Sequence, residues 1–240
     1  SEVPAAVKLE ECWQLVETSE KTKQHCMILE NCCYDFFELM TLNMARQGYF
    51  GEIVHTEGAY IHALLESNFD KDGYYDMWRL KENMRNGSLY QTHGLGPIAQ
   101  ALDINRGDRM DYLVSVSSND FMMSATAKEL AAKDSFYKAY ENKTLRGNMN
   151  STTIKTVKGK TMMIQHDVTS PRPYSRIHLV SGTKGTALKY PEPPRISNGH
   201  EGYELPDLGQ RPGEDGCADQ IGQHVHRPAH QRWRNVIEQI

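Results

Sequence analysis

The chain is organised around residues 88–108, which read SLYQTHGLGPIAQALDINRGD. Tyr90 and His93 stand three residues apart, directly before Gly94 and Gly96. Both side chains therefore lie where the first amide N–H groups of a predicted helix are free and its dipole is positive. A phenol and an imidazole beside free N–H donors suit the binding of a polyhydroxylated or anionic ligand.

The glycines of this stretch, together with Ala99, also match the dinucleotide-binding pattern G-x-G-x-x-A. That pattern requires a buried strand directly before the first Gly. Here residues 85–88, RNGS, are turn formers, and the four residues that follow Leu89 are too polar and too short for a parallel strand. We interpret the match as coincidence and expect the function of the stretch in Tyr90 and His93.

The composition indicates a soluble, mixed α and β globular protein. Its 240 residues suffice for one large domain or two small ones. A formal net charge of −4 gives no reason to expect nucleic acid or an anionic membrane as partner. No apolar run approaches the roughly 20 residues of a membrane span. The five Cys, with Cys32 next to Cys33 and no C-x-x-C pair, predict neither a disulfide framework nor a zinc site, so we expect most of them to be buried.

The first predicted helix carries an apolar stripe at helical spacing, which is simplest to explain as core packing. Its members are Leu9, Cys12, Trp13 and Val16. A second helix is predicted to begin after Asp35, with Glu38 completing a capping box.

Residues 26–29, CMIL, predict a short buried strand that ends at Glu30 and Asn31. Polar residues directly after a buried strand are where α/β proteins tend to place ligands. The alternative, that Glu30 and Asn31 only begin a loop, stays equally open.

Residues 51–62 alternate as a strand does, so that Tyr60 and His62 point to the same side. Such a pair can line a pocket, or it can belong to a half-exposed strand face. Residues 66–86 then read as a long loop with Trp78 and Arg79 among its charges. Long loops inside compact domains are usually functional, although these rings could also pin the loop to the body.

The second half of the chain is predicted to be mostly β. We expect strands over 112–116, 154–157, 162–168, 177–180 and 187–190, and one helix over 121–140. The Lys158-Gly159 turn predicts a hairpin, and tight turns between successive strands predict an antiparallel sheet.

From Pro191 the chain becomes rich in Pro, Gly, Asp, Gln and His, with little periodicity. His224, His226 and His230 form H-x-H-x-x-x-H, which could bind a metal. A Pro-broken tail lacks the packed surroundings that metal ligands need, so we expect no metal site.

Six segments, taken together, resemble one family. They are SEVPAA (1–6), ENCCY (30–34), EGAYIH (57–62), MWRLK (77–81), YQTHGLGP (90–97) and SPRPYSRIHLVSGTKG (170–185). In this order the chain resembles the NAD-dependent α-N-acetylgalactosaminidases of glycoside hydrolase family 109, within the Gfo/Idh/MocA oxidoreductase-like superfamily. The resemblance covers roughly Ser1 to Tyr190.

The resemblance implies a Rossmann domain for NAD followed by an α+β domain, an open, mainly antiparallel sheet with helices on one face. Residues 1–30 would then be the remnant of the nucleotide-binding domain, whose main part is missing from this sequence. Residues 31–190 would form the substrate and oligomerisation domain, and residues 191–240 an atypical tail prone to disorder. A homo-oligomer would form through the sheet.

The resemblance also implies the chemistry: NAD-dependent, redox-assisted elimination and water addition that release terminal α-N-acetylgalactosamine from a glycan, outside the usual two-carboxylate scheme. Tyr60 would remove the C2 proton, and His93 would bind or deprotonate the C3 hydroxyl. The expected substrate-binding residues are Tyr60, Arg79, Tyr90, Gln91, Thr92, His93 and Tyr174. The expected NAD contacts are Glu2, Val3, Asn31 and Tyr90, with Glu30 and His62 as further pocket residues.

Two departures and two alternatives remain. Gln91 stands where the family usually has Pro, and the loop 81–87 is about one residue short, which leaves the aim of Arg79 open. The chain could instead be a sugar oxidoreductase of the same superfamily, although Val3 replaces the Lys of many such dehydrogenases. It could also be a non-catalytic carbohydrate-binding or oligomerisation fragment. A periplasmic, secreted or cytoplasmic location all fit the sequence.

Overall fold

The structure, a computed structural model, describes residues 5–73, 77–190, 193–200 and 202–203, all within the compact unit Ser1–Pro206. Predictions made for Glu2, Val3 and the histidines of residues 224–230 lie outside the described residues. Along the chain the elements are α1 (Leu9–Thr22), the 3-10 helix η1 (Asn31–Tyr34), α2 (Phe36–Arg46), β1 (Ile53–Ile61), α3 (Leu65–Asn68), α4 (Trp78–Glu82), α5 (Thr92–Ala101), β2 (Met110–Ser117), α6 (Met123–Lys133), η2 (Ser135–Ala139), β3 (Asn150–Thr156), β4 (Thr161–Asp167), β5 (His178–Gly182), β6 (Thr186–Lys189) and β7 (Arg195–Ser197).

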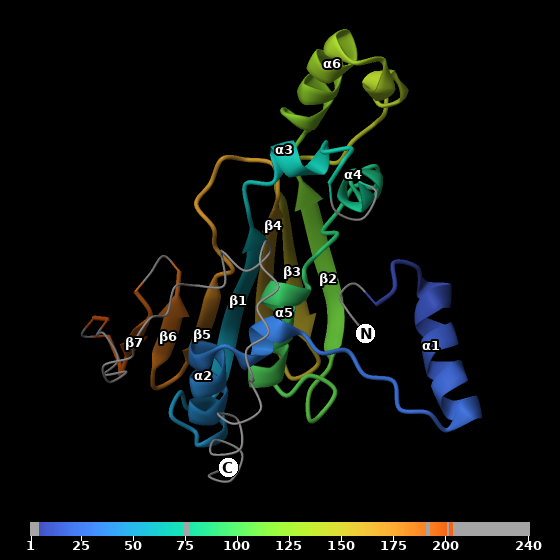
Figure 1. Ribbon diagram of the computed structural model, residues 1–240. Coiled ribbons are helices and arrows are strands. Elements are labelled where there is room, and N and C mark those ends of the chain that lie inside the picture. Colours follow the sequence, from blue (N-terminus) through green and yellow to red (C-terminus); the bar gives the residue numbers. More distant parts are fainter. Residues whose placement is uncertain (1–4, 74–76, 191–192, 201, 204–240) are drawn as a thin grey trace, which may run out of the picture. The chain divides into compact units, whose positions relative to one another are not determined.

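The strands form one seven-stranded sheet in the order β2-β3-β4-β1-β5-β6-β7 (Figure 1). β1 pairs with β4 in parallel, and the other strand pairs are antiparallel. This confirms the predicted open, mainly antiparallel sheet, including the hairpin that joins β3 to β4. β1 is the middle strand, so residues at its end have neighbours on both sides.

Helices α2 and α5 lie over one face of the sheet, in front of it in Figure 1. The main core fills the space between them and the inward side chains of the strands. Its most buried members are Phe37, Phe50, Ile98, Leu102, Met162, Ile164, Val180 and Ala187. On the other face the alternate residues of β2 stay open: Tyr112, Val114 and Val116 are 60–66% exposed in the described part of the chain.

A second core lies among the short helices α3, α4, α6 and η2, around Phe69, Leu80 and Met123. The segment predicted as one long loop, residues 66–86, is therefore structured in part. Phe69 and Leu80, which stand among its charges, are the buried side chains that anchor it. No helix among the described residues is long and apolar enough to cross a membrane.

The contact between α5 and β1 is a contact between backbones. A Cβ on Gly58 would lie 2.3 Å from the carbonyl oxygen of Gly94, and a Cβ on Gly94 would lie 2.3 Å from the amide nitrogen of Ala59. Any side chain at either position would force the helix away from the strand, because real Cβ atoms do not approach backbone so closely. Gly94 in the 88–108 stretch therefore serves helix–strand packing.

Two sequence predictions for the first 35 residues are wrong. The stripe of α1 is not core: Leu9 and Trp13 are 68% and 59% exposed, and the helix buries no residue. Residues 26–29 form no strand and are exposed. Cys12 and Cys26 are exposed too, whereas Cys32 and Cys33 are buried. Apolar periodicity identifies the face that would be buried, but burial needs an opposing apolar surface, which the described residues do not provide here.

The predicted capping box of α2 does not form either. Asp35 occupies the N-cap position without a side-chain cap bond and accepts a hydrogen bond from Arg176 instead. Glu38 is buried and pairs with Lys189 at 3.2 Å. A buried guanidinium and ammonium attract these carboxylates more strongly than a neutral N–H does.

Replacing Gly94 with Ala tests the backbone contact. Ala ordinarily stabilises a helix relative to Gly, but here overpacking dominates, so Gly94→Ala should lower the free energy of unfolding by about 1–3 kcal/mol. Gly107→Ala is the matched control, because its Cβ would meet nothing closer than the Cβ of Asp103, at 3.7 Å. Urea unfolding measures both. A Gly94→Ala variant as stable as the wild type would show that the backbones are not in contact.

Candidate functional site

Tyr60 lies at the centre of a cluster of aromatic side chains. It is only 2% exposed. The rings of His62, Tyr90, His93, His166 and Tyr174 have their centroids 5.1–6.5 Å from its own. β1, β4, α5 and the segments before α5 and β5 each contribute at least one of these rings. We refer to these six residues as the ring cluster.

His62 stacks on Tyr60 with ring planes only 5° apart, so the two side chains do point the same way, as the alternation predicts. Burial lowers the pKa of His62, and the nearby cation of Arg79 lowers it further. Burial and the cations of Arg146 and Arg79 hold the pKa of His166 well below its ordinary value. Both imidazoles are therefore neutral at neutral pH.

His93 is held by a buried carboxylate. Its Nδ1 lies 2.6 Å from Oε1 of Glu30, which also accepts a bond from the backbone N–H of Cys32 at 3.1 Å. Burial alone would raise the pKa of Glu30, but the hydrogen bond and charge of His93 and the Cys32 N–H together lower it. An ionised carboxylate can only accept, so Nδ1 of His93 carries the proton. In the neutral ring, Nε2 is then the nitrogen with a free lone pair.

Arg79 lies across two rings at the edge of the ring cluster. Its guanidinium carbon is 4.5 Å from the centroid of Trp78 and 5.2 Å from that of Tyr90. Burial raises the pKa of Tyr90 even though Arg79 opposes the shift, so its phenol is neutral at neutral pH. The short loop after α4 therefore leaves Arg79 beside the other predicted sugar-binding residues.

The structure brings most of the predicted site residues together, but not all. Tyr60, His62, Tyr90, His93 and Tyr174 belong to the ring cluster, with Glu30 and Arg79 in contact with it. Gln91 is the N-cap residue of α5, and Thr92 is its first residue. Asn31 is exposed at the start of η1, outside the cluster.

Sequence reasoning missed His166, which lies beside Tyr60 in the register of β1 with β4. The signal was present, because His166 follows Met162 and Ile164 on the inward face of β4. A histidine on an otherwise apolar face calls for a partner, and Arg146 provides it through a hydrogen bond to Nδ1.

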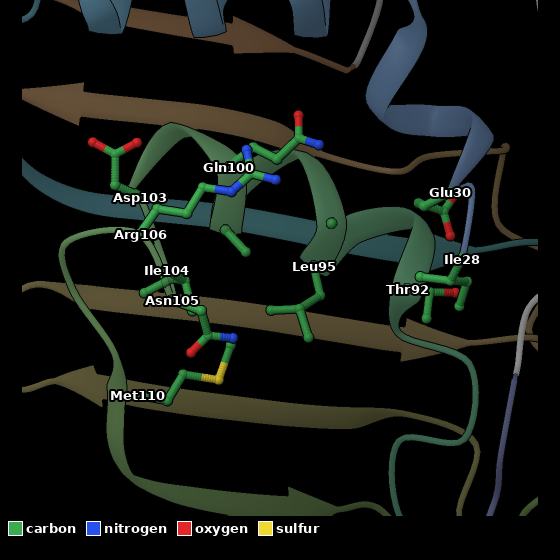
Figure 2. A pocket seen from close by; sticks show the side chains of 12 residues that line it. Ile28, Glu30, Thr92, Leu95, Gln100, Asp103, Ile104, Asn105, Arg106 and Met110 are labelled. Atoms are coloured by element: carbon green, nitrogen blue, oxygen red, sulfur yellow. The ribbon is translucent and has the colours of Figure 1, made fainter. Parts of the chain in front are cut away.

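A pocket of about 310 Å³ lies beside the ring cluster, along α5 and the loop that follows it. Figure 2 shows Glu30 and Thr92 at one end, and Asp103, Asn105 and Arg106 toward the other. Glu30 therefore contacts His93 and also lines a cavity. In the described ranges, one group of side chains is close enough to share a metal ion: Glu30, Cys32 and His93.

The ionised state of Glu30 has a measurable consequence. A carboxyl whose folded-state pKa lies below the ordinary 4.5 stabilises the folded chain above that pH, and the stabilisation is lost as the pH falls through the lower value. The difference in unfolding free energy between wild type and Glu30→Gln should therefore be largest above pH 4.5 and shrink toward pH 3. Urea unfolding across this range measures it, with the exposed Glu52→Gln as control. A difference that does not change with pH would contradict the assignment.

Comparisons with known proteins agree with this architecture. The family model "Glycosyl hydrolase 109, C-terminal domain" matches residues 34–201. An alpha-N-acetylgalactosaminidase of Bacteroides fragilis is 53% identical over 219 residues, which are 88% of this chain and 51% of the relative. A glycosyl hydrolase family 109 protein of Shewanella sp. is 50% identical over 206 residues, 84% of this chain and 43% of the relative. The chain thus spans about half the length of these relatives.

Solved structures show the same fold at low identity. An inositol dehydrogenase homolog from Azotobacter vinelandii, complexed with NAD+, superposes with a TM-score of 0.60 at 14% identity, covering 85% of this chain and 49% of that one. The UDP-N-acetylglucosamine 3-dehydrogenase GnnA from Acidithiobacillus ferrooxidans gives 0.56 at 13% identity, covering 88% of this chain and 55% of that one. The fold is therefore that of the C-terminal half of Gfo/Idh/MocA oxidoreductases, and the sequence match makes the chain a member of glycosyl hydrolase family 109, of which it carries the C-terminal domain.

Proposed function

We propose that this chain forms the sugar-binding and proton-transfer half of an NAD-dependent glycosidase that removes terminal α-N-acetylgalactosamine. The observation that carries the proposal is the imidazole of His93, which Glu30 orients within the ring cluster. Its ring centroid lies 5.1 Å from that of Tyr60. The family membership supports it, as does the similarity to the alpha-N-acetylgalactosaminidase of Bacteroides fragilis.

The residues suit proton transfer on a neutral sugar. Nε2 of His93 can accept the proton of the C3 hydroxyl, because Glu30 fixes the ring and stabilises the imidazolium that forms. Tyr60 lies across from it and would take the proton from C2. Neither role needs a second carboxylate, which fits the exception that NAD-dependent glycosidases make to the two-carboxylate scheme.

The remaining polar side chains would hold the sugar. Arg79 is already positioned by its stacking on Trp78 and Tyr90, so its donors can bind hydroxyls with little further loss of side-chain freedom. Tyr174 would contact the sugar as well, and its ring centroid lies 5.1 Å from that of His62. Gln91 and Thr92 would add hydrogen bonds from the first turn of α5.

NAD, when bound, would supply the oxidation at C3 and its reversal. We infer that Asn31 and Tyr90 contact it, together with Glu2 and Val3. Asn31 is exposed at the start of η1 and therefore accessible to a cofactor. We assign residues 1–30 to a nucleotide-binding half of the enzyme. The exposed apolar side chains of α1 and residues 27–29 suit packing against the rest of that half. The sequence placed residues 191–240 in a tail, but Arg195–Ser197 form β7 of the sheet, so we assign only the chain after β7 to a tail.

The test is release of p-nitrophenol from its α-N-acetylgalactosaminide. It should be made with the chain alone and with a hybrid in which the chain replaces the matching half of the Bacteroides fragilis enzyme. We expect NAD-dependent release by the hybrid and little by the chain alone. No release by a folded hybrid would contradict the glycosidase proposal, and net NADH formation from free sugar would identify a sugar oxidoreductase instead.

Replacing Tyr60 with Phe in the hybrid separates the roles of Tyr60 and His93. Loss of the C2 base should lower kcat by roughly 100- to 10,000-fold. Exchange of the C2 proton with solvent should also stop, whereas oxidation at C3 continues. Proton NMR in heavy water measures the exchange. Exchange at the normal rate in Tyr60→Phe would rule out Tyr60 as the C2 base.

The open face of the sheet suits a second copy of the chain. Tyr112, Val114 and Val116 form an apolar row on β2, and a contiguous apolar row of this kind is typical of an interaction surface. We infer a homo-oligomer through this face. Light scattering should show a dimer or larger species that Val114→Lys dissociates. A monomeric wild type would contradict the inference.

A further inference from the structure

Glu30, Cys32 and His93 bring three different metal-ligating atoms together. A carboxylate oxygen, the thiol sulfur and an imidazole nitrogen all lie within 4.8 Å of one another. Glu30 and Cys32 come from the start of η1, and His93 comes from α5, so the group joins two elements of the fold. Glu30 and Cys32 are 8% and 1% exposed.

The second oxygen of Glu30 is an independent sign of a ligand. Oε1 is used by His93 and by the Cys32 N–H. Oε2 is buried and has no partner at full hydrogen-bond geometry in the described part of the chain, although the Thr92 hydroxyl lies close enough to the carboxylate to help lower its pKa. A buried carboxylate oxygen without a partner costs free energy, which a bound cation would recover.

The spacing needs only small shifts to hold a tetrahedral cation. With zinc bonds of about 2.0–2.3 Å, ligand atoms lie roughly 3.3–3.8 Å apart. Oε1 and Nδ1 are now 2.6 Å apart, and the free Oε2 gives the carboxylate a second way to reach the cation. The separations between ligand atoms therefore change by no more than about 1.5 Å, which rotation of two side chains can supply.

The donor set selects the metal. One thiolate, one imidazole and one carboxylate are ligands that Zn²⁺ accepts, whereas Mg²⁺ and Ca²⁺ prefer oxygen alone. The charges also balance, because a thiolate and a carboxylate neutralise a divalent cation in a buried position. Arg176 attracts Cys32 electrostatically and is itself paired with Asp35 and Glu38.

Access comes from the pocket beside α5, since Glu30 lines it (Figure 2). The covered Oε2 becomes accessible from this pocket when the side chain of Glu30 moves, which does not require unfolding of η1.

We infer that Glu30, Cys32 and His93 form a three-ligand site for Zn²⁺, with the fourth position open to water. On binding, Cys32 releases its thiol proton to solvent, and the proton of the imidazole moves from Nδ1 to Nε2. A cation held there removes His93 from proton transfer and so acts as a reversible inhibitor. That consequence rests on the proposed function, whereas the binding itself does not.

The test uses Co²⁺ as a spectroscopic probe of the 240-residue chain after treatment with a chelator. A thiolate ligand gives Co²⁺ a sulfur-to-metal charge-transfer band, to which the histidines of the tail cannot contribute. We expect the band to saturate at one equivalent and to disappear when Zn²⁺ displaces Co²⁺. Glu30→Gln should weaken the affinity by roughly 10- to 100-fold.

Variants at three of the four other thiols control for unspecific binding. The band should vanish in Cys32→Ser and persist in Cys33→Ser, which changes the neighbouring buried thiol. It should also persist in the double variant Cys12→Ser, Cys26→Ser, which removes two exposed thiols. Circular dichroism confirms that each variant is folded. Absence of the band in the wild type, or its survival in Cys32→Ser, would overturn the inference.

Discussion

The backbone of α5 touches the backbone of β1 at Gly94 and Gly58, and the geometry of the candidate site follows from that contact. Tyr60 lies two residues beyond Gly58 on the same face of the strand, and His93 directly precedes Gly94. Bringing the two backbones together therefore brings the two rings to a centroid distance of 5.1 Å. A helix held off by even one methyl group would separate the phenol from the imidazole. The sequence tolerates glycines inside a short helix because this packing compensates for their low helix propensity.

Charged side chains set the protonation and orientation of the rings that this backbone contact brings together. Glu30 is the ionised carboxylate that holds His93, while burial and cations keep His62 and His166 neutral. The site thus combines one oriented imidazole, whose Nε2 has a free lone pair, with neutral rings. It has little excess negative charge to repel a cofactor phosphate or a developing oxyanion. These properties suit the stepwise proton transfer on a neutral carbohydrate that the proposed function requires.

Local patterns predicted those parts of the fold that depend on local physics. The hairpin joining β3 and β4, and the shared direction of Tyr60 and His62, follow from turn chemistry and strand alternation. The role of Gly94 in α5 did not follow, because it depends on a strand more than thirty residues earlier in the chain. The stripe of α1 failed for a related reason, since amphipathicity does not reveal whether an opposing surface exists. The side chain of Asp35 does not cap α2 as predicted, because it accepts a hydrogen bond from Arg176, which lies 141 residues later in the chain. Residue patterns singled out Tyr60, Tyr90 and His93, and the family resemblance supplied their roles and added further candidates such as Tyr174. Only the structure shows which of the candidates lie together.

The protonation of His93 is the most direct test of this account, because both the oriented base and its carboxylate partner determine it. Long-range proton–nitrogen NMR of the nitrogen-labelled chain, with His93→Gln for assignment, identifies the tautomer at a pH where the ring is neutral. The account predicts a proton on Nδ1, in a strong hydrogen bond that Glu30→Gln weakens, and a bare Nε2 whose resonance shifts when N-acetylgalactosamine is added. A neutral ring with its proton on Nε2, unaffected by Glu30→Gln, would contradict it.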